Sequence, residues 1–337
     1  MASFLFYGMC VSYTKIYKLS NLCEKMKKAL ITGGMGFIGS HLARNLVRAG
    51  DDVTILSRSD KRANISDIVG SVKVVLKDVR DISPNDVGES DHVYHLAGTV
   101  DNYAVENGEP FRDVEVNCVG TQALLEACRL SATKPRIFFG STFFVYGNLK
   151  SLPATVDSPT NPLSLYAATR LCAENMCQIY NRTYGLDTVI ARFTNVFGPG
   201  DINASKQKGA FDWMIGSAVK GEKIKVYDNG DFIRDFIYVD DAVEACKTLI
   251  SEGEKGGVYN IGRGPVKFAD LIEMLREKVP GMETEAMPPP QHHVNVGTKN
   301  FYADSGTTRA LGWEPNVSLD EGIFRTVEYY RKNRSLS

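Results

Sequence analysis

The feature that most constrains the fold is a short apolar run that ends in glycines and passes directly into a helical pattern. Residues 29–32 form the apolar run, and Gly33, Gly36 and Gly39 follow with the spacing G-x-x-G-x-x-G. A strand, a tight turn and a helix start in this order present free backbone N–H groups and a positive helix end to a pyrophosphate. An ordinary glycine-rich turn would also satisfy the spacing, but the strand–turn–helix context favours a dinucleotide-binding loop.

Each glycine of this loop has its own expected task. The first permits the turn, the second lets the phosphates approach, and the third lets the helix pack on the strand. The helical pattern begins at Phe37 and Ile38, whose N–H groups stand at the helix start. We therefore expect cofactor contacts at Gly33, Gly36, Phe37, Ile38 and Gly39.

Size, charge and cysteine content narrow the class of protein. A chain of 337 residues can form one large α/β domain with an added lobe, or two ordinary domains. Its 43% hydrophobic and 23% charged residues are typical of a soluble globular protein. A net charge of −1 without a block of like charges argues against nucleic acid as a partner. Seven scattered cysteines without a C-x-x-C pair predict free thiols in a reducing compartment, the cytoplasm, and no metal site.

The first 25 residues stand apart from the rest. The apolar stretch 1–13 is too short to span a bilayer, and it lacks the basic region and cleavage site of a secretory signal. Met26 looks like a natural start immediately before the first strand. We interpret residues 1–25 as an appended extension and expect no membrane partner, with a membrane-surface anchor as the alternative.

Strands and helices alternate over the first two thirds of the chain. Apolar, β-branched runs predict strands, and helical spacing predicts helices between them. The predicted strands after the glycine loop are 52–56, 72–76, 92–98, 136–142 and 188–193, and the main predicted helices are 111–128 and 165–184. This order predicts an α/β fold, a doubly wound parallel (Rossmann) sheet with right-handed crossovers.

The alternation breaks at Thr194, which predicts a smaller C-terminal substrate-binding lobe. A strand and helix return over 236–249 and another strand over 258–262, whereas 265–331 is expected to be helical with a break at the prolines 288–290. The predicted organisation is an extension (1–25), a dinucleotide-binding Rossmann domain (26–193 and 235–262) and a substrate-binding lobe (194–234 and 263–331).

The ends of the second and third strands bear on the choice between NAD and NADP. An acidic residue after the second strand would hold the adenosine ribose and repel a 2′-phosphate, but Ser57 and Arg58 stand there. A hydroxyl beside a guanidinium suits a 2′-phosphate, which favours NADP, although a solvated basic loop is the competing interpretation. Asp78, next to Val79, is placed to accept a hydrogen bond from the adenine amino group, or simply to cap the next turn.

The fourth and fifth strands end in small and hydroxyl-bearing residues, at the edge where ligands of a parallel sheet collect. Leu96, Ala97 and Gly98 would let the backbone lie against a flat cofactor, whereas His95 is better explained as a buried core histidine. Asn117, within a predicted helix, suggests a backbone-bridging or water-holding task near the cofactor. Thr142 ends the fifth strand.

Further motifs follow in a characteristic order. Tyr166 and Arg170 are four residues apart and therefore share a helix face. The other motifs are Thr32–Gly39, His95–Gly98, Asn117–Thr121, Ser141-Thr142 with Val145–Gly147, Tyr166–Arg170, Arg192–Pro199, Arg234–Asp241, Tyr259–Gly262 and Leu311–Pro315. Together they resemble the extended short-chain dehydrogenase/reductases, specifically the NAD(P)-dependent nucleotide-sugar epimerase/dehydratase family, which is UDP-glucose 4-epimerase-like. The resemblance covers almost everything from Lys27 to Lys332.

The resemblance implies roles for single residues. Tyr166 would exchange a proton with a sugar hydroxyl while the nicotinamide exchanges a hydride with the same carbon, and Thr142 would hydrogen-bond that oxygen. Asn195 would hold the substrate, a nucleoside-diphosphate sugar, and Arg234 its diphosphate. Arg170 would favour the phenolate of Tyr166 and contact the cofactor. The resemblance also implies a homodimer formed through the helices 111–128 and 166–184.

Three departures from the family pattern refine this expectation. The family has lysine where this chain has Arg170, which keeps the charge but changes its geometry. Phe143 and Phe144 occupy the positions of the acid pair of 4,6-dehydratases, so dehydration is not expected. The C-terminal arginine that many relatives use on the diphosphate has no counterpart around 291–295.

Three functions remain open at this point. The leading interpretation is a nucleotide-sugar epimerase acting by hydride transfer at C4. An NADPH-dependent 4-ketosugar reductase is the alternative suggested by Ser57-Arg58. A non-catalytic NADP-binding sensor or scaffold is the alternative from another class, suggested by Arg170.

Overall fold

The computed structural model describes residues 26–99, 108–201, 209–296 and 299–333, so the predicted extension 1–25 lies outside the described residues. Seven parallel strands form the central sheet in the order β10-β6-β5-β4-β1-β2-β3. They are β1 (Lys28–Thr32), β2 (Asp52–Ser57), β3 (Val72–Leu76), β4 (His92–His95), β5 (Arg136–Thr142), β6 (Thr188–Phe193) and β10 (Val258–Ile261). The predicted doubly wound parallel sheet is confirmed.

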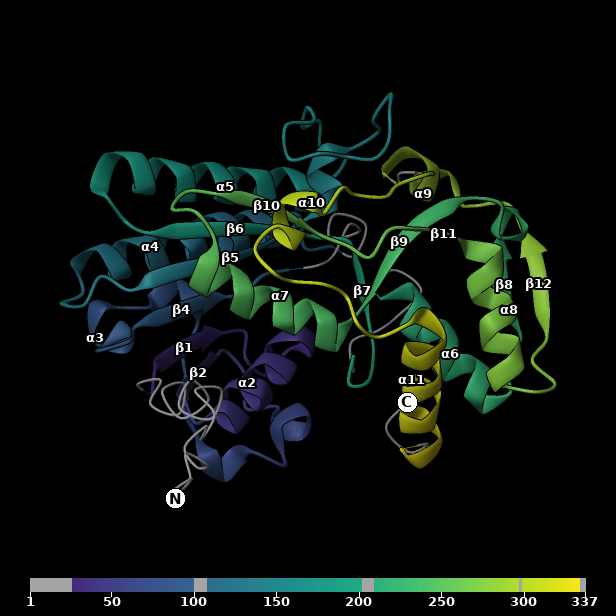
Figure 1. The fold of residues 1–337 in the computed structure, drawn as a ribbon, viewed down its shortest axis with the longest axis horizontal. Coiled ribbons are helices and arrows are strands. Elements are labelled where there is room, and N and C mark those ends of the chain that lie inside the picture. The colour runs from purple at the N-terminus through teal and green to yellow at the C-terminus, as the bar shows by residue number, and fades with distance from the viewer. Residues whose placement is uncertain (1–25, 100–107, 202–208, 297–298, 334–337) are drawn as a thin grey trace, which may run out of the picture.

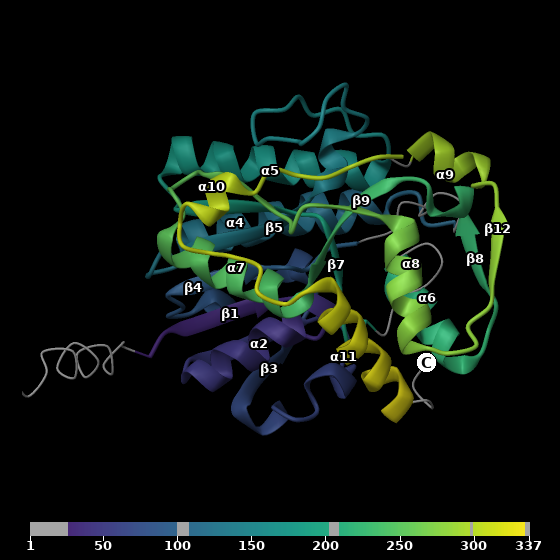
Figure 2. The ribbon, with the colours of Figure 1, turned by 45° about the vertical axis from the view of Figure 1, so that its right-hand side comes forward.

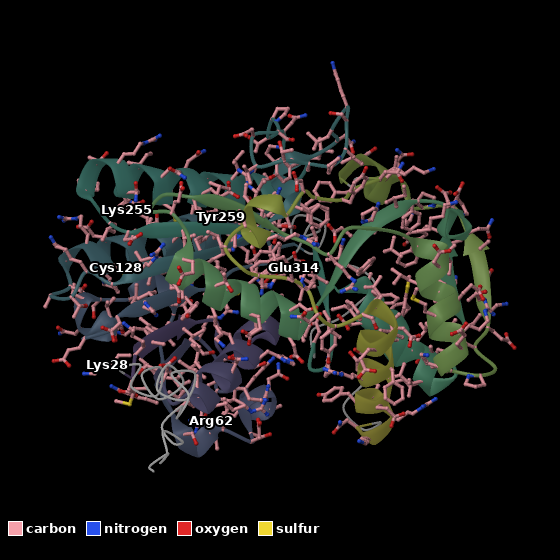
Figure 3. The ribbon with its side chains drawn as sticks, in the orientation of Figure 1. Lys28, Arg62, Cys128, Lys255, Tyr259 and Glu314 are labelled. Atoms are coloured by element: carbon pink, nitrogen blue, oxygen red, sulfur yellow. The ribbon has the colours of Figure 1, made fainter. Side chains whose placement is uncertain are left out.

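Helices cover both faces of the sheet. Figure 1 shows α4 and α5 over one face and α2 and α7 over the other. Their bounds are α2 (Phe37–Ala49), α3 (Pro84–Val87), α4 (Gly120–Leu130), α5 (Leu165–Tyr184) and α7 (Val239–Glu252). Side chains of each layer fill the space against the sheet, Cys128 among them (Figure 3). Within the described residues, no helix has the length and apolar character needed to cross a membrane.

The short elements at the strand ends differ from the sequence-based expectation. The strand predicted over 92–98 ends at His95 in the structure. The helix predicted over 111–128 contains a π-helix, η5 (Val114–Val119), which continues into α4. The turn after β5 is a 3-10 helix, η6 (Phe143–Tyr146). The remaining short turns are η2 (Arg62–Ile65), η3 (Val69–Ser71), η4 (Val79–Asp81) and η7 (Asp228–Gly230).

The second lobe gathers at one end of the molecule (Figure 2). It contains a three-stranded sheet of order β11-β9-β7 and a two-stranded sheet β12-β8. The strand expected from residue 236 is β9, whereas β7, β8, β11 and β12 were missed, and β11 and β12 correct the expectation that 265–331 is helical. The elements are β7 (Asn195–Phe197), α6 (Ala210–Lys220), β8 (Ile224–Tyr227), β9 (Ile233–Tyr238), β11 (Pro265–Lys267), α8 (Phe268–Lys278), β12 (Thr284–Met287), α9 (Gln291–Val296) and α11 (Leu319–Lys332). The short helix α10 (Gly306–Arg309) instead lies against β10 of the main sheet (Figure 2). A separate, aromatic-rich core joins α6, α8 and α11.

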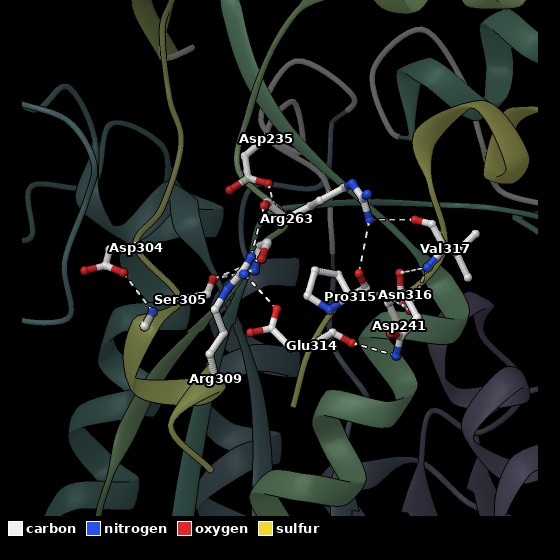
Figure 4. Close-up of polar contacts among 12 residues, drawn as sticks. Asp235, Asp241, Arg263, Asp304, Ser305, Arg309, Glu314, Pro315, Asn316 and Val317 are labelled. Carbon is white, nitrogen blue, oxygen red and sulfur yellow. Dashed lines mark hydrogen bonds and ion pairs between the residues drawn. The ribbon is translucent and has the colours of Figure 1, made fainter. Parts of the chain in front are cut away.

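A polar junction joins the C-terminal segment to both parts of the chain (Figure 4). Asp235 is fully buried and accepts backbone N–H groups of Arg263, Gly264 and Ala303. Asp241 accepts the backbone N–H groups of residues 316 and 317, and its carbonyl accepts the indole N–H of Trp313. The acidic residues of the Arg234–Asp241 motif therefore hold the fold together.

Candidate active site

The glycine loop has the geometry expected of a phosphate-binding turn. Gly33 has φ +74°, a conformation that side-chain-bearing residues rarely adopt, and a Cβ there would lie 2.7 Å from the Ala97 backbone nitrogen. A Cβ on Gly39 would collide with the Gly33 carbonyl oxygen. No side chain caps the N-terminus of α2, and no acidic residue lies in its first turn. The first N–H groups of α2 are therefore left for an anionic ligand.

The end of β4 lies against this loop and against α5. Leu96 and Ala97 back Gly33, while a Cβ on Gly98 would lie 2.5 Å from Nη1 of Arg170 and 3.0 Å from Oδ1 of Asn117. Small residues are therefore needed here to admit the guanidinium. His95, one residue earlier, is buried between the hydroxyls of Thr32 (2.7 Å) and Thr121 (2.9 Å), which confirms a core histidine.

Asn117 bridges the end of β4 to α5 from within the π-helix η5. Its Oδ1 accepts the backbone N–H of Thr99 at 3.0 Å, and its Nδ2 donates to the hydroxyls of Thr99 (2.8 Å) and Thr169 (3.0 Å). Such π-turns are frequent at functional sites. The bridging task expected for Asn117 is what the structure shows, and its contact with the cofactor stays a prediction.

Tyr166 and Thr142 meet at the ends of α5 and β5. Ser164 caps α5 by accepting the Ala167 N–H at 3.2 Å, which fixes the helix start next to Tyr166. The Thr142 side chain interacts with the Tyr166 hydroxyl and acts to lower its pKa. Both side chains are less than 10% exposed, so the pair is largely shielded from water.

Arg170 lies one turn after Tyr166 and is also buried. Its guanidinium covers the ring of Phe139, with Cζ 4.6 Å from the centroid, and its Nε has no hydrogen-bond partner among the described residues. Burial lowers the pKa of Arg170 from its ordinary value. A buried cation without a carboxylate partner is costly, which marks this position as one made for a ligand.

The pKa of Tyr166 is the outcome of opposing effects. Burial raises it above the ordinary value, and the charge of Arg170 and the hydrogen bond with Thr142 act in the opposite direction. The expected influence of Arg170 on Tyr166 is therefore present, but in the protein alone burial outweighs it.

The strand ends near the expected adenosine position carry several cations. Ser57 donates to the Ser59 carbonyl (2.9 Å), and Arg58 is exposed with no ion-pair partner among the described residues. Asp78 caps η4 through the N–H of Arg80 and also receives its guanidinium at 3.0 Å. That guanidinium holds the pKa of Asp78 below its ordinary value. Asp78 thus has the capping task considered as its alternative role.

The expected substrate residues lie on the second lobe. Asn195 donates from Nδ2 to the Asp235 carbonyl at 2.8 Å. Arg234 donates to the carbonyls of Ile233 and Lys299 and lies over the Phe232 ring at 4.7 Å. Burial lowers the pKa of Arg234 to about 10.

A hollow of about 550 Å³ opens beside these residues. The loop 148–152 forms one side of it, and Val294, Lys299 and Asn300 form the other. Lys150 and Lys299 bring positive charge to opposite sides of the hollow, and Lys299 is also 3.2 Å from Asp228. Two lysines and several amide or hydroxyl groups suit an anionic, hydroxyl-rich ligand.

Comparison with known proteins identifies the family. Residues 29–262 match the model described as the NAD dependent epimerase/dehydratase family. The chain belongs to this family. The members of this NAD-dependent epimerase/dehydratase family are enzymes, and the nicotinamide dinucleotide expected from the glycine loop is their cofactor.

Relatives of this family member align over nearly its whole length. It is similar to the low-salt glycan biosynthesis protein Agl12 of Haloferax volcanii, with 34% identity over 89% of this chain and 97% of that one. The UDP-glucose 4-epimerase of Thermotoga maritima, solved with UDP-glucose, has a TM-score of 0.82 and 29% identity over 91% and 99% of the chains. The UDP-glucose 4-epimerase of Thermus thermophilus, solved with NAD, has a TM-score of 0.80 and 30% identity over 91% and 99%.

The residues of this epimerase/dehydratase family member fit a dinucleotide. The uncapped α2 N-terminus provides backbone N–H groups, and Arg170 provides an Nε that has no hydrogen-bond partner among the described residues. Gly98 lets the Arg170 guanidinium approach the end of β4. Sequence reasoning missed the role of Thr99 and Thr169, which hold Asn117, because these contacts depend on how the end of β4, η5 and α5 pack together. Phe139 under Arg170 could have been suspected from its place on β5, three residues before Thr142.

Proposed function

We propose that this protein is a nucleotide-sugar epimerase acting at C4 of a nucleoside-diphosphate sugar. The observation that carries the proposal is the buried Tyr166–Thr142 pair together with the buried Arg170, whose Nε has no hydrogen-bond partner among the described residues. Bound NAD(P) supplies the hydride acceptor and donor for the reacting carbon. Tyr166 removes the proton from the C4 hydroxyl and later returns it, while Thr142 holds the same oxygen. Arg170 stabilises the phenolate electrostatically.

The cofactor is proposed to lie between the glycine loop and α5. The N–H groups of Phe37, Ile38 and Gly39 would hold the pyrophosphate, because no side chain occupies that helix end. The N–H of Gly36 is itself donated to the Gly33 carbonyl at 2.9 Å, so Gly36 would contribute its small size rather than a hydrogen bond. Residues 96–98, Asn117 and Arg170 would line the nicotinamide side, and residues 57–58 and 78–79 the adenosine side. The close approach of Gly33 to Ala97, and of Gly98 to the Arg170 guanidinium, supports this placement because it brings the glycine loop, the end of β4 and α5 together.

The diphosphate and sugar are proposed to lie toward the second lobe. Lys150 and Lys299 supply cations to the hollow, and Arg234 donates to the Lys299 carbonyl at its edge. These cations would compensate for the missing arginine near residues 291–295. Asn195 has its amide oxygen left to accept from the substrate, since its Nδ2 is bound to the Asp235 carbonyl. Dehydration is not proposed, because Phe143 and Phe144 carry no acid group.

Replacing Tyr166 by Phe tests the proposal directly. We expect turnover of a nucleoside-diphosphate hexose to fall by about 10²- to 10⁴-fold, because the acid–base group is lost while the ring remains. Epimer formation is measured by chromatography, and cofactor binding by fluorescence serves as the control for folding. Equal turnover by the variant and the parent would contradict the catalytic assignment.

Cofactor retention separates the epimerase from the reductase. An epimerase keeps its cofactor through a cycle, so NAD(P) should remain after desalting and be found by mass spectrometry. Loss of cofactor on desalting, with net NADPH consumption, would favour the 4-ketosugar reductase suggested by Ser57-Arg58. A protein that binds NADPH but turns over no nucleotide sugar of a broad panel would instead be a sensor or scaffold.

We further propose a preference for NADP over NAD. Arg58 and Lys61 are exposed and have no ion-pair partner among the described residues, whereas Arg62, labelled in Figure 3, pairs with Asp60. A hydrogen bond to a charged group contributes about 1.5–3 kcal/mol, so Arg58→Ala should weaken NADP binding by about tenfold or more. Titration by fluorescence measures this, with Arg62→Ala as the matched control. An equal loss for NAD and NADP would contradict the preference.

A homodimer is proposed through η5–α4 and α5. Leu165 and Ile179 are exposed on one face of α5, and Val114 and Val119 are exposed on η5, which packs against α5. Exposed apolar side chains gathered on neighbouring helices are typical of an interface. Sedimentation should give twice the chain mass, and a single-chain mass at micromolar concentration would contradict it.

The domain limits and location remain proposals as well. Separate cores support a Rossmann unit (26–193 and 235–262) and a substrate-binding lobe (194–234 and 263–331), with Trp313 returning to the first core. Five cysteines of the described residues are free thiols, which supports a reducing, cytoplasmic location.

A further inference from the structure

Two phenylalanines after Thr142 build an aromatic column next to Tyr166. The ring of Phe143 stacks on that of Phe144, with centroids 4.2 Å apart, and packs on Phe301 at 4.5 Å. Phe144 meets Tyr166 edge to face, with centroids 6.3 Å apart and planes at 73°. The backbone N–H of Phe144 also donates to Thr142 Oγ1 at 3.3 Å. Phe144 is therefore fixed against both members of the proposed catalytic pair.

Exposure separates Phe144 from the rest of the column. Phe143 and Phe301 are buried, and Tyr146 behind Phe301 is fully buried, whereas Phe144 is only half-buried. The column thus reaches the surface at Phe144, beside Tyr166. Apolar surface at this position borders the space in which a sugar must lie if Tyr166 acts on its hydroxyl.

We propose that Phe144 is a specificity-determining residue that packs against the reacting sugar and selects sugars with an uncharged C5 substituent. The inference rests on the proposed C4 chemistry. A ring next to Tyr166 lies near the neighbours of C4, and the C5 substituent is the group that differs between hexoses (CH₂OH), 6-deoxyhexoses (CH₃) and hexuronates (COO⁻). The C–H groups of a sugar pack well on an aromatic ring, whereas a carboxylate there loses water without gaining a partner.

The buried arginines near the column do not offer that partner. The guanidinium of Arg192 lies over Tyr146 and is bound by Glu174 at 2.7 Å. Arg170 is stacked on Phe139, against Gly98 at the end of β4. An apolar wall also makes no hydrogen bond to a hydroxyl, so it discriminates weakly between a hexose and a 6-deoxyhexose. The expected substrate class is therefore the neutral hexoses, with or without the 6-hydroxyl.

Three substrates that share one nucleotide test this selection. For the wild-type protein, kcat/KM for the hexose and the 6-deoxyhexose should agree within about tenfold, and the hexuronate should be about 100-fold worse or more. Phe144→Ser should raise KM for the hexose about tenfold. It should also reduce the ratio of kcat/KM for the hexose to kcat/KM for the hexuronate about tenfold. Phe324→Ser, at an exposed position on α11, is the matched control and should change neither value.

A second variant guards against a folding defect. Phe144→Tyr keeps the ring and should hold the hexose-to-hexuronate ratio within about threefold of the wild-type value. A wild-type preference for the hexuronate would overturn the inference. It would also be overturned if Phe144→Ser still turned over the hexose but left the hexose-to-hexuronate ratio of kcat/KM unchanged. Absence of turnover with every sugar in the wild-type protein would instead contradict the proposed function itself.

Discussion

Arg170 and Arg192 are two buried arginines that differ in one respect. They are 5% and 6% exposed, and their guanidinium groups lie 4.6 Å and 4.7 Å from the centroids of the Phe139 and Tyr146 rings. Glu174 stands one turn after Arg170 on α5, yet its carboxylate binds Arg192 at 2.7 Å. Arg170 has no carboxylate partner among the described residues.

The pKa values of the two groups respond accordingly. Burial lowers the pKa of Arg170, whereas Glu174 outweighs the effect of burial and raises the pKa of Arg192. With the same burial and the same aromatic support, one cation is thus paired with a carboxylate and the other is not, and we propose that the second acts on Tyr166. A buried charged group without a partner of opposite charge in the protein is typical of a ligand site.

The largest effect is expected at the paired arginine. Arg192→Met leaves the carboxylate of Glu174 buried without its cation, so the free energy of unfolding should fall by about 3–5 kcal/mol. Urea denaturation followed by circular dichroism measures it. Lys247→Met, which breaks the exposed pair with Glu244, should cost less than about 1 kcal/mol. If Arg192→Met lowered the free energy of unfolding as little as Lys247→Met does, Arg192 would not have the structural role assigned to it.

The unpaired arginine should show the reverse pattern. Arg170→Met removes a buried charge that has no carboxylate partner, so the free energy of unfolding should stay the same or rise. Turnover should fall about 100-fold, because the phenolate of Tyr166 loses its stabilising charge. Paired measurements of urea stability and epimerisation rate check this. A large loss of stability with turnover preserved would show that Arg170 is a second structural cation.

A smaller effect is expected in the pH dependence. Burial raises the pKa of Tyr166 and Arg170 acts against it, so the rate should rise with pH as Tyr166 is deprotonated. Arg170→Met removes the lowering influence and should shift this limb to higher pH by about one unit or more, while Arg170→Lys keeps the charge and the wild-type limb. Initial rates from pH 6 to 10 give both profiles. If Arg170→Met and Arg170→Lys had the same pH–rate profile, the charge of Arg170 would not influence Tyr166.

The sequence predicted the parts of the molecule that depend on local pattern. The parallel strands, the glycine loop and the Tyr166–Arg170 helix were all predictable, because periodicity and spacing determine them. The strands β7, β11 and β12 are only three or four residues long, too short to show a period. The pairing of Glu174 with Arg192, and hence the isolation of Arg170, depends on how α5 sits on β6, which no local pattern encodes.

The junction of Figure 4 has a consequence for how the chain reaches its native state. Trp313 belongs to the core that supports β1 and β2, although some 250 residues separate them in sequence. Asp235 and Asp241 also receive their backbone partners from residues beyond the last strand of the main sheet. A ribosome that has made only the nucleotide-binding half therefore holds an unfinished domain. The core of the main sheet is complete only after residues 313–317 have left the exit tunnel.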